Sequence, residues 1–364
     1  MDRQKIFDFY KGKKVFVTGH TGFKGSWLVK ILLMSGAEVT GYSLEPPTEP
    51  SLFEILGLGD AVGLNNITGD VRDFELLRKS LTESGADIVF HLAAQPIVRE
   101  SYRNPRETFE TNVMGTVNIC EAVRLCGSVK SFLNVTTDKV YKNNEWAWGY
   151  RENEPLDGFD PYSNSKSCSE LVTHSYINSF FGGNEEGASV AVSTARAGNV
   201  IGGGDFAADR IIPDCVRAVQ SAEPIIIRNP LSTRPYQHVL EPLFAYMGIA
   251  AEQYQDVKKA GFYNVGPETE DNLNTGELVG LFAKYYGEGF KSEIAPVDSM
   301  APHEANFLKL DTSLLKSTFD WAPVWHTPEA VEKTVEWTKA WRLDPSSGNM
   351  NAVCEDQIKE YIRG

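Results

Sequence analysis

The sequence has no long run of apolar residues. No window approaches the ~20 consecutive apolar residues of a membrane-spanning helix, although 42% of the 364 residues are hydrophobic. The N-terminal segment Met1-Asp-Arg-Gln-Lys5 is polar and leads into no apolar run of the signal-peptide kind. We therefore expect a cytoplasmic chain whose core is large enough for one big domain or two unequal lobes.

The sequence also has few cysteines, no internal repeat and no excess of positive charge. The chain carries 35 basic and 49 acidic residues, a net charge of −14, which makes nucleic acid an unfavourable partner. An anionic small molecule would have to be held by local arginines or by helix N-termini. No two cysteines have the spacing of metal ligands, so we expect no metal site and reduced thiols at Cys120, Cys126, Cys168, Cys215 and Cys354.

Strand and helix patterns alternate through the first half of the chain. Strands are predicted at 14–18, 38–43, 65–68, 87–91, 131–136 and 189–195, and helices at 22–34, 73–81, 105–125 and 160–180. This alternation predicts an α/β fold, a Rossmann-type doubly wound parallel sheet, with a smaller, mixed α/β C-terminal lobe. We expect residues 1–198 to form the sheet domain, a segment near 236–265 to return to it, and residues 199–364 to form mainly the smaller lobe.

A glycine pattern follows the first predicted strand. "VFVTGHTGFKG" places Gly19, Gly22 and Gly25 three residues apart, at the start of the first helix. Glycine permits a tight turn and lets backbone N–H groups approach a pyrophosphate, and the helix dipole favours its charge. The context predicts a dinucleotide-binding turn rather than an ordinary one. Lys24 within it either offsets phosphate charge or is a solvated surface lysine.

The second strand ends Gly41-Tyr-Ser-Leu-Glu45, without the acid that usually bonds the adenosine ribose at this place. NADP would favour an arginine here, and Glu45 would repel a 2′-phosphate, so we expect NAD. Asp70, at the end of the third strand, either bonds the adenine amine or caps the next helix.

Two further motifs carry acid–base groups. "PYSNSKSCSE" puts Tyr162 and Lys166 on one face of a helix, where a cation can lower the pKa of a phenol that is otherwise near ~10. "TTDKVY" follows the fifth strand and places Thr137, Asp138 and Lys139 at the sheet edge that usually carries the chemistry of a parallel sheet. A Tyr-x-x-x-Lys match alone is weak, but together with the glycine turn it predicts an oxidoreductase-type site.

These features together resemble the extended short-chain dehydrogenase/reductase superfamily and, within it, the nucleotide-sugar 4,6-dehydratases. Supporting stretches are "VFHLAAQ", "NPRETFETNVMGT", "ARAGNVIGGGD", "RPYQHV" and "YNVGP", and the resemblance runs from about Lys14 to Pro323. "GHTGFKGSWL" with "TTDKVY" resembles members that act on CDP-glucose more than those acting on dTDP-glucose, GDP-mannose or UDP-sugars. The resemblance implies an NAD-dependent hydro-lyase in deoxysugar biosynthesis for cell-surface polysaccharide.

The resemblance also implies a role for each catalytic residue. Tyr162 removes the C4 hydroxyl proton while NAD takes the C4 hydride, Lys166 tunes the tyrosine and holds the cofactor ribose, and Thr137 bonds the C4 oxygen. Asp138 protonates the departing C6 hydroxyl, and hydride returns to C6. Lys139 stands where dTDP-glucose relatives carry a glutamate as the C5 base. It acts as a neutral base, which we favour, or stabilises the C4 enolate as a cation, or only forms a salt bridge with Asp138.

The resemblance assigns the remaining site residues as well. Trp146 and Trp148 either line a loop near the sugar or form a partner surface, whereas Arg210 and Arg228 are weaker candidates and are expected at the surface. The expected cofactor contacts are Gly19, Thr21, Gly22, Phe23, Lys24, Gly25, Asp70, Val71, Leu92, Ala93, Ala94, Thr111, Thr136, Tyr162 and Lys166. The expected substrate contacts are Gln95, Asn112, Asn199, Arg234, Tyr236 and His303.

Three alternatives stay open from the sequence. A dehydratase for another nucleotide sugar would share every motif, and a 4-epimerase would share all but the need for Asp138. A non-catalytic NAD-sensing protein would be expected to lose Tyr162 or Lys166, and this chain keeps both. Family members pair two long helices, here about 105–125 and 160–180, so we expect a homodimer or a dimer of dimers.

Overall fold

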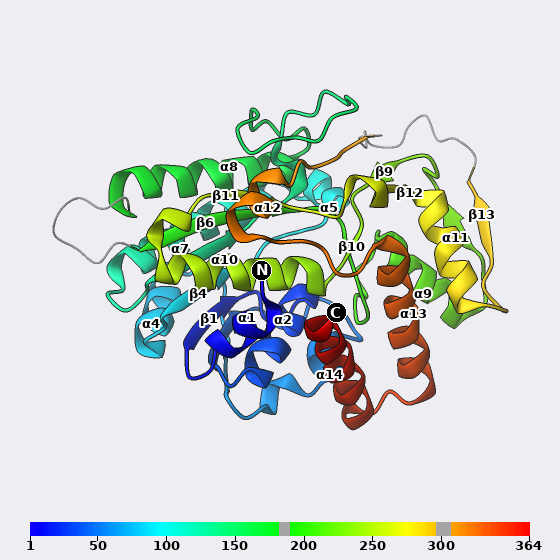
Figure 1. Cartoon of the computed structure of the whole chain (residues 1–364), viewed down its shortest axis with the longest axis horizontal. Helices are drawn as coiled ribbons and strands as arrows, with labels where there is room; N and C mark the ends of the chain where they lie inside the picture. Colours follow the sequence, from blue (N-terminus) through cyan, green and yellow to red (C-terminus); the bar gives the residue numbers. More distant parts are fainter. Residues whose placement is uncertain (182–189, 296–306) are drawn as a thin grey trace.

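A seven-stranded parallel sheet forms the centre of the protein in the computed structural model, which describes residues 1–181, 190–295 and 307–364 (Figure 1). The strand order is β11-β6-β5-β4-β1-β2-β3, and every neighbouring pair is parallel. The strands are β1 (Lys14–Thr18), β2 (Glu38–Ser43), β3 (Leu64–Thr68), β4 (Ile88–His91), β5 (Ser131–Val135), β6 (Ala191–Ala197) and β11 (Phe262–Val265). The order reverses between β1 and β4, which is where a doubly wound sheet binds its ligand.

Helices cover both faces of the sheet because the strands are apolar on both sides. Val15 and Val17 of β1 point into one buried cluster, whereas Phe16 between them points into another. The first face carries α1 (Arg3–Phe9), α2 (Phe23–Met34) and α10 (Leu240–Gln255), and the second carries α4 (Phe74–Ser84), α7 (Gly115–Leu125) and α8 (Pro161–Tyr176). The predicted doubly wound fold is confirmed.

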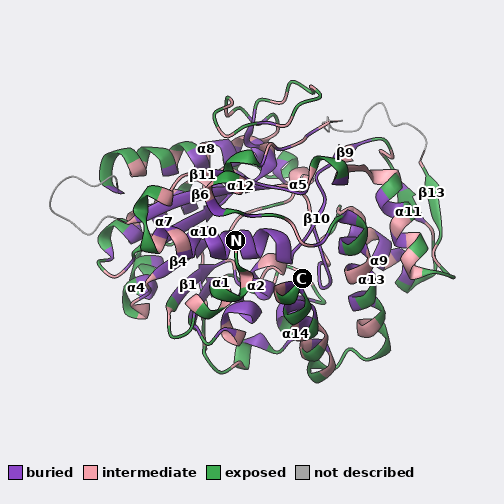
Figure 2. Cartoon of the chain, viewed as in Figure 1, coloured by how far each residue is buried: buried purple, intermediate pink, exposed green. Residues whose placement is uncertain are grey.

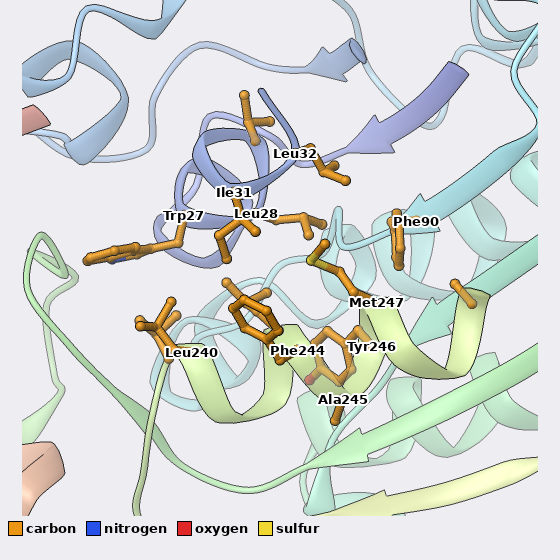
Figure 3. Close-up of a cluster of buried hydrophobic side chains, with 14 of the residues drawn as sticks. Trp27, Leu28, Ile31, Leu32, Phe90, Leu240, Phe244, Ala245, Tyr246 and Met247 are labelled. Carbon is orange, nitrogen blue, oxygen red and sulfur yellow. The ribbon is translucent and has the colours of Figure 1, made fainter. Parts of the chain in front are cut away.

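Side chains of α2 and α10 meet within the first cluster (Figure 3). Leu28 and Leu32 of α2 lie near Phe244 and Met247 of α10, with Phe90 of β4 beside them. All five side chains are almost fully buried. This packing fixes the N-terminus of α2, and therefore the glycine turn, against the sheet.

The predicted helix over 105–125 contains a change of winding. It comprises α6 (Pro105–Phe109), a π-helical turn (Glu110–Met114) and α7, while α8 continues into a second π-helical turn (Ile177–Phe181). A π turn inserts one extra residue and rotates the side chains that follow it. A short helix not expected from the sequence, α5 (Val98–Arg103), precedes this long one.

A smaller cluster of buried residues forms the core of the second lobe. Its helices are α9 (Ile211–Ser221), α11 (Thr275–Tyr286) and α13 (Thr327–Leu343). Three two-stranded pairs accompany them: β7 (Val200–Ile201) with β10 (Gln237–His238), β9 (Thr233–Arg234) with β12 (Leu273–Asn274), and β8 (Ile225–Ile227) with β13 (Ser292–Ile294). Figure 2 shows buried segments at the centre of both parts and exposed ones around the rim.

The final helix, α14 (Ser347–Arg363), packs on the main core rather than on the smaller one. Met350, Cys354 and Ile358 belong to the same buried cluster as α2 and α10. The remaining short elements are α3 (Leu52–Ile55), α12 (Ser313–Phe319) and four 3-10 helices, Leu58–Asp60, Asp138–Val140, Val257–Lys259 and Thr269–Asp271.

Within residues 1–181, 190–295 and 307–364, no helix is long and apolar enough to cross a membrane. The same residues contain no group of His, Cys, Asp and Glu that could hold a metal ion. All five cysteines are free, and Cys168 is the one that is partly exposed.

Candidate active site

The glycine turn between β1 and α2 leaves no room for a side chain at Gly19 or Gly25. Gly19 has φ +74°, and a Cβ there would lie 2.7 Å from the backbone nitrogen of Ala93. A Cβ on Gly25 would lie 2.1 Å from the Gly19 carbonyl oxygen. Gly22 begins α2, no side chain caps this helix, and a Cβ on Gly22 would meet only the Gly19 oxygen, at 3.5 Å. The turn therefore presents uncapped N–H groups and an open approach, which fits a dinucleotide pyrophosphate.

Side chains around the turn hold it in place. Thr21 Oγ1 is 2.9 Å from both Ser43 Oγ and the Leu44 carbonyl oxygen, so it ties the turn to the end of β2. The backbone N–H of Leu92 donates to the Thr18 carbonyl (3.2 Å), which places the segment of Leu92, Ala93 and Ala94 beside Gly19. The expected cofactor residues of these two segments therefore lie together.

Asp70 lies at the end of β3 in an ion pair. Its carboxylate is 2.5 Å from the Arg72 guanidinium, whose hydrogen bonds lower the pKa of Asp70. The alternative that Asp70 caps the next helix is wrong, because Asp73 accepts from the Leu76 N–H and caps α4.

The Thr137–Lys139 segment follows β5 and meets α8. The Lys166 ammonium donates to the Val135 carbonyl at 3.1 Å, and a hydrogen bond from Thr137 lowers the pKa of Tyr162. Burial is the larger effect and raises the pKa of Tyr162 to about 12. Burial also lowers the pKa of Lys166 to about 8, although the charge of Glu170 raises it. The predicted tyrosine–lysine pair and the Thr137 hydroxyl are thus brought together.

The two oxygens of the Asp138 carboxylate have different surroundings. Oδ1 accepts from Thr137 Oγ1 and from Lys139 Nζ, both at 2.9 Å. Oδ2 is buried and has no hydrogen-bond partner in the described part of the chain. Lys139, whose side chain is 27% exposed, also donates to Asn199 Oδ1 at 3.1 Å. The segment therefore holds one acid oxygen in place and leaves the other available.

Glu170 joins the ends of two strands to α8, one helical turn beyond Lys166. It accepts hydrogen bonds from Thr136 and, at 2.7 Å, from Thr194 Oγ1, and it is 3.0 Å from the Arg196 guanidinium. All four side chains are buried. Thr136, an expected cofactor contact, thus uses its hydroxyl within the protein.

Two expected substrate residues also bond mainly within the protein. Asn112, on the first π-helical turn, accepts from the Gln95 backbone N–H (2.8 Å) and donates to the Gln95 carbonyl (3.1 Å) and to Ser165 Oγ (2.9 Å). The Gln95 side chain donates to Thr108 Oγ1 at 2.9 Å. Asn112 therefore fastens the loop after β4 to α8, which is a supporting position.

Two more expected substrate residues lie in the second lobe. Arg234 of β9 is buried and donates to the Thr233 carbonyl, and Tyr236 is buried with its hydroxyl 3.4 Å from Thr275 Oγ1. Val71 is buried against Gly115, at the start of α7, and Thr111 lies on the same π-helical turn as Asn112. His303 lies outside the described residues.

The sequence analysis missed one residue near the catalytic group, Tyr246, and treated another, Arg210, only as a weaker candidate. Arg210, expected at the surface, is 3.1 Å from Asp205, and its charge lowers the pKa of both Tyr162 and Lys24. Burial is the main cause that lowers the pKa of Lys24 to about 7. Tyr246 of α10 is fully buried, and its hydroxyl has no partner among the described residues. Burial raises the pKa of Tyr246, and the charges of Tyr162 and Asp138 raise it further. No motif marks Tyr246, because it comes from an apolar helix late in the chain.

The chain belongs to the NAD dependent epimerase/dehydratase family, whose model matches residues 15–266. Its cofactor is accordingly NAD. The chain is 49% identical over 358 residues to the CDP-glucose 4,6-dehydratase of Salmonella typhimurium, covering 98% of each protein. It is 28% identical over 338 residues to the dTDP-glucose 4,6-dehydratase of Streptomyces antibioticus, covering 90% of this chain and 93% of that protein.

Solved structures show the same fold at lower sequence identity. An epimerase from Methanothermobacter thermautotrophicus superposes with a TM-score of 0.79 at 22% identity, covering 94% of this chain and 96% of that one. A dTDP-glucose 4,6-dehydratase from Bacillus anthracis, in complex with NAD, gives a TM-score of 0.74 at 21% identity, covering 90% and 97%. The resemblance inferred from the motifs is confirmed.

Proposed function

We propose that the chain is an NAD-dependent hydro-lyase that converts CDP-D-glucose to CDP-4-dehydro-6-deoxy-D-glucose and water. The observation that carries the proposal is the Asp138 carboxylate beside the Tyr162–Lys166 pair. One of its oxygens accepts hydrogen bonds, and the other has no partner among the described residues. An epimerase has no use for such an acid. The similarity to the Salmonella enzyme supports CDP-glucose as the substrate.

In the first step Tyr162 takes the proton of the C4 hydroxyl. The Tyr162 phenol has a pKa of about 12 when buried, so the phenolate requires positive neighbours, and Arg210 already acts in that direction. When bound, NAD supplies the hydride acceptor for C4 and the hydride that later reaches C6. Thr137 is placed to hydrogen-bond the C4 oxygen, and Lys166 to hold the ribose.

The second step removes water across C5 and C6. Asp138 donates its proton from Oδ2, the oxygen that has no partner among the described residues, to the departing C6 hydroxyl. We propose Lys139 as the C5 base. The ion pair of Lys139 and Asp138 differs from the neutral amine and carboxylic acid only in the position of one proton, so this contact is compatible with an acid–base pair.

Replacing the lysine tests this assignment. Lys139→Met should still oxidise C4, seen as NADH absorbance, but should lose water at least about 100-fold more slowly, as expected for removal of a general base. Rapid water loss by this variant would exclude Lys139 from the elimination.

We further propose that Asn199 and Arg234 hold the substrate diphosphate and that Tyr236 contacts the base. A guanidinium binds phosphate oxygens through two parallel hydrogen bonds, which suits a diphosphate. NAD and nucleotide sugars are cytoplasmic metabolites, and we propose that the enzyme works in that compartment.

Mass spectrometry tests the function directly. The purified protein is incubated with NAD and separately with CDP-glucose, dTDP-glucose, UDP-glucose or GDP-mannose. Loss of one water from CDP-glucose alone is the expected result. Water loss from a different sugar nucleotide would overturn the substrate, and isomerisation without water loss would overturn the reaction in favour of an epimerase.

We also propose a homodimer formed through α7, α8 and the turns beside them. These elements expose Met114 (50%), Leu125 (50%), Leu171 (52%) and Phe180 (57%), an apolar surface typical of an interface. Leu171→Glu should convert the dimer to a monomer by light scattering, whereas Leu343→Glu, on the end of α13, should not. A wild-type mass equal to one chain would refute the proposal.

A further inference from the structure

Lys139 donates hydrogen bonds to two side chains. Its ammonium is 2.9 Å from Asp138 Oδ1 and 3.1 Å from Asn199 Oδ1. Asp138 is the preceding residue in the chain, whereas Asn199 is 60 residues away, between β6 and β7. The flexible stem of a lysine allows many directions for the amine, so one partner beside it in the sequence would not fix its position. The contact with Asn199 supplies the second point that defines where the amine lies.

Lys139 in turn decides which way the Asn199 amide faces. An ammonium carries three donors and no acceptor, so it can meet only the amide oxygen of Asn199. Nδ2 therefore lies on the other side of the amide group, and it makes no hydrogen bond within residues 1–181, 190–295 and 307–364. Asn199 is partly exposed. Two N–H donors at a partly open position suit the oxygens of an anion.

The backbone of Asn199 is fixed to the segment that carries Arg234. The Asn199 carbonyl oxygen accepts from the Gln237 N–H at 3.0 Å. A Cβ on the preceding residue, Gly198, would lie 2.6 Å from Cγ of Pro235, so the two backbones are in close contact. Asn199 therefore lies where the catalytic segment after β5 meets the segment proposed to bind the nucleotide.

We propose that Asn199 is a positioning residue for Lys139 and couples the place of this amine to the substrate diphosphate. Oδ1 accepts from the Lys139 amine, whether charged or neutral, while Nδ2 donates to a phosphate oxygen. The two contacts use different atoms of one planar group, so both form at once. A bound diphosphate thus fixes the amide, and the amide holds the amine for its work at C5. The inference rests on the proposed function, in which Lys139 acts at C5.

Two substitutions of Asn199 separate this role from diphosphate binding alone. Asn199→Asp has nearly the same shape, keeps an acceptor for Lys139 and loses both N–H donors. Asn199→Ala loses the acceptor and the donors. Both variants should raise the KM for CDP-glucose by about 10-fold or more, because a hydrogen bond to a charged phosphate is lost. A raised KM is expected of any diphosphate contact, so a second readout is needed.

The pH profile of water loss reports on Lys139. Water loss is measured by rapid quench and mass spectrometry with saturating NAD and CDP-glucose, and C4 oxidation is followed by NADH absorbance. A carboxylate at position 199 favours the ammonium form of Lys139, so the profile of Asn199→Asp should move to higher pH by on the order of one unit. The profile of Asn199→Ala should move to lower pH, because the ammonium loses an acceptor. These directions are the same for a neutral base and for a cation, because the same amine titrates.

The other charged groups that face Lys139 are the same in both variants. They are Asp138 on its own segment and Lys24 of the glycine turn, whose charge interacts with that of Lys139. Arg234→Lys is the matched control, since it keeps the positive charge but loses the planar fork that suits a diphosphate. It should raise the KM for CDP-glucose and leave the pH profile of water loss in place.

Raised KM values with unmoved pH profiles in both Asn199 variants would overturn the proposal and leave Asn199 as a diphosphate contact alone. Shifts of both profiles in the same direction, or a comparable shift in Arg234→Lys, would overturn it as well. Shifted profiles with an unchanged KM would overturn the coupling to the diphosphate. A wild-type protein that dehydrates no nucleotide sugar would instead refute the proposed function.

Discussion

His20 explains why β2 carries a glycine at position 41. The imidazole of His20 is fully buried over Gly41, so that a Cβ on Gly41 would lie 2.4 Å from the ring. Its Nε2 is 2.7 Å from Asn66 Oδ1 on β3, and its ring packs against Phe53. The sequence shows this glycine, but the reason for it is a contact between the glycine turn and β2, which could not be predicted from the motif.

Gly41→Ala should therefore destabilise the protein. The new Cβ displaces the His20 ring, and overpacking of this kind costs about 1–3 kcal/mol. The free energy of unfolding in urea measures the loss. Gly280→Ala is the control, because a Cβ there meets nothing within 4 Å on helix α11, and it should stabilise by up to ~1 kcal/mol. Equal effects of the two substitutions would contradict the contact.

Lys166→Met should stabilise the ligand-free protein at neutral pH while it removes activity. Burial holds the pKa of Lys166 at about 8, against 10.5 in the unfolded chain, so the unfolded state binds more protons between these values. Wild-type stability therefore rises with pH through this window. At about pH 7 the variant should be more stable than wild type by on the order of 3 kcal/mol, less the contribution of the lost hydrogen bond to Val135. This difference should vanish near pH 10. Calorimetry at both pH values would show a constant difference if the lysine were unperturbed.

At the scale of elements, strands were easier to predict than changes within helices. β1 and β5 are short and mainly apolar, so both their positions and the sheet edge with Thr137 followed from local pattern. The π-helical turn at Glu110–Met114 did not follow from local pattern. Asn112, on this turn, bonds to Gln95 and Ser165, and the sequence could not predict which residues it reaches.

Asn112→Ala should cost about 1–3 kcal/mol of stability, since the Gln95 N–H and carbonyl lose their partner in a buried place. It should also lower kcat, because the loop after β4 loses its anchor to α8. Ser165→Ala removes one of these bonds and should cost less. A urea titration in which both variants lose the same stability would contradict the anchoring role.

At the scale of the molecule, the site is assembled from both parts of the chain. Tyr162 comes from the first half, whereas Arg210 and Tyr246 come from segments after the sixth strand. Late segments carry weaker periodicity, and their contacts are long range, so sequence patterns located the tyrosine–lysine pair but not these neighbours. Glu241 of α10 shows the same long-range character, because it accepts from the Val324 and Trp325 N–H groups and from the Tyr361 hydroxyl.

Glu241→Gln should make stability less dependent on pH. Burial raises the pKa of Glu241 from 4.5 to about 7, so the folded state binds more protons in this interval and wild-type stability falls as pH rises through it. Glutamine can accept from both N–H groups and meet Tyr361. The variant should therefore be more stable than wild type at about pH 8, on the order of 2–3 kcal/mol, with a smaller difference near pH 5. Thermal unfolding at both pH values measures this difference in stability. An equal difference between variant and wild type at the two pH values would argue against a Glu241 that titrates.

The position of α14 has a consequence for how the protein is made. Helix α1 and helix α14 contact the same α10–α2 core, which also receives β11 at the sheet edge. The dinucleotide-binding half therefore cannot complete its core until α14 has left the ribosome. Nascent chains that already carry the whole glycine turn and the catalytic pair still expose the apolar faces of α1 and α2. We expect such chains to be prone to aggregation until this core is completed.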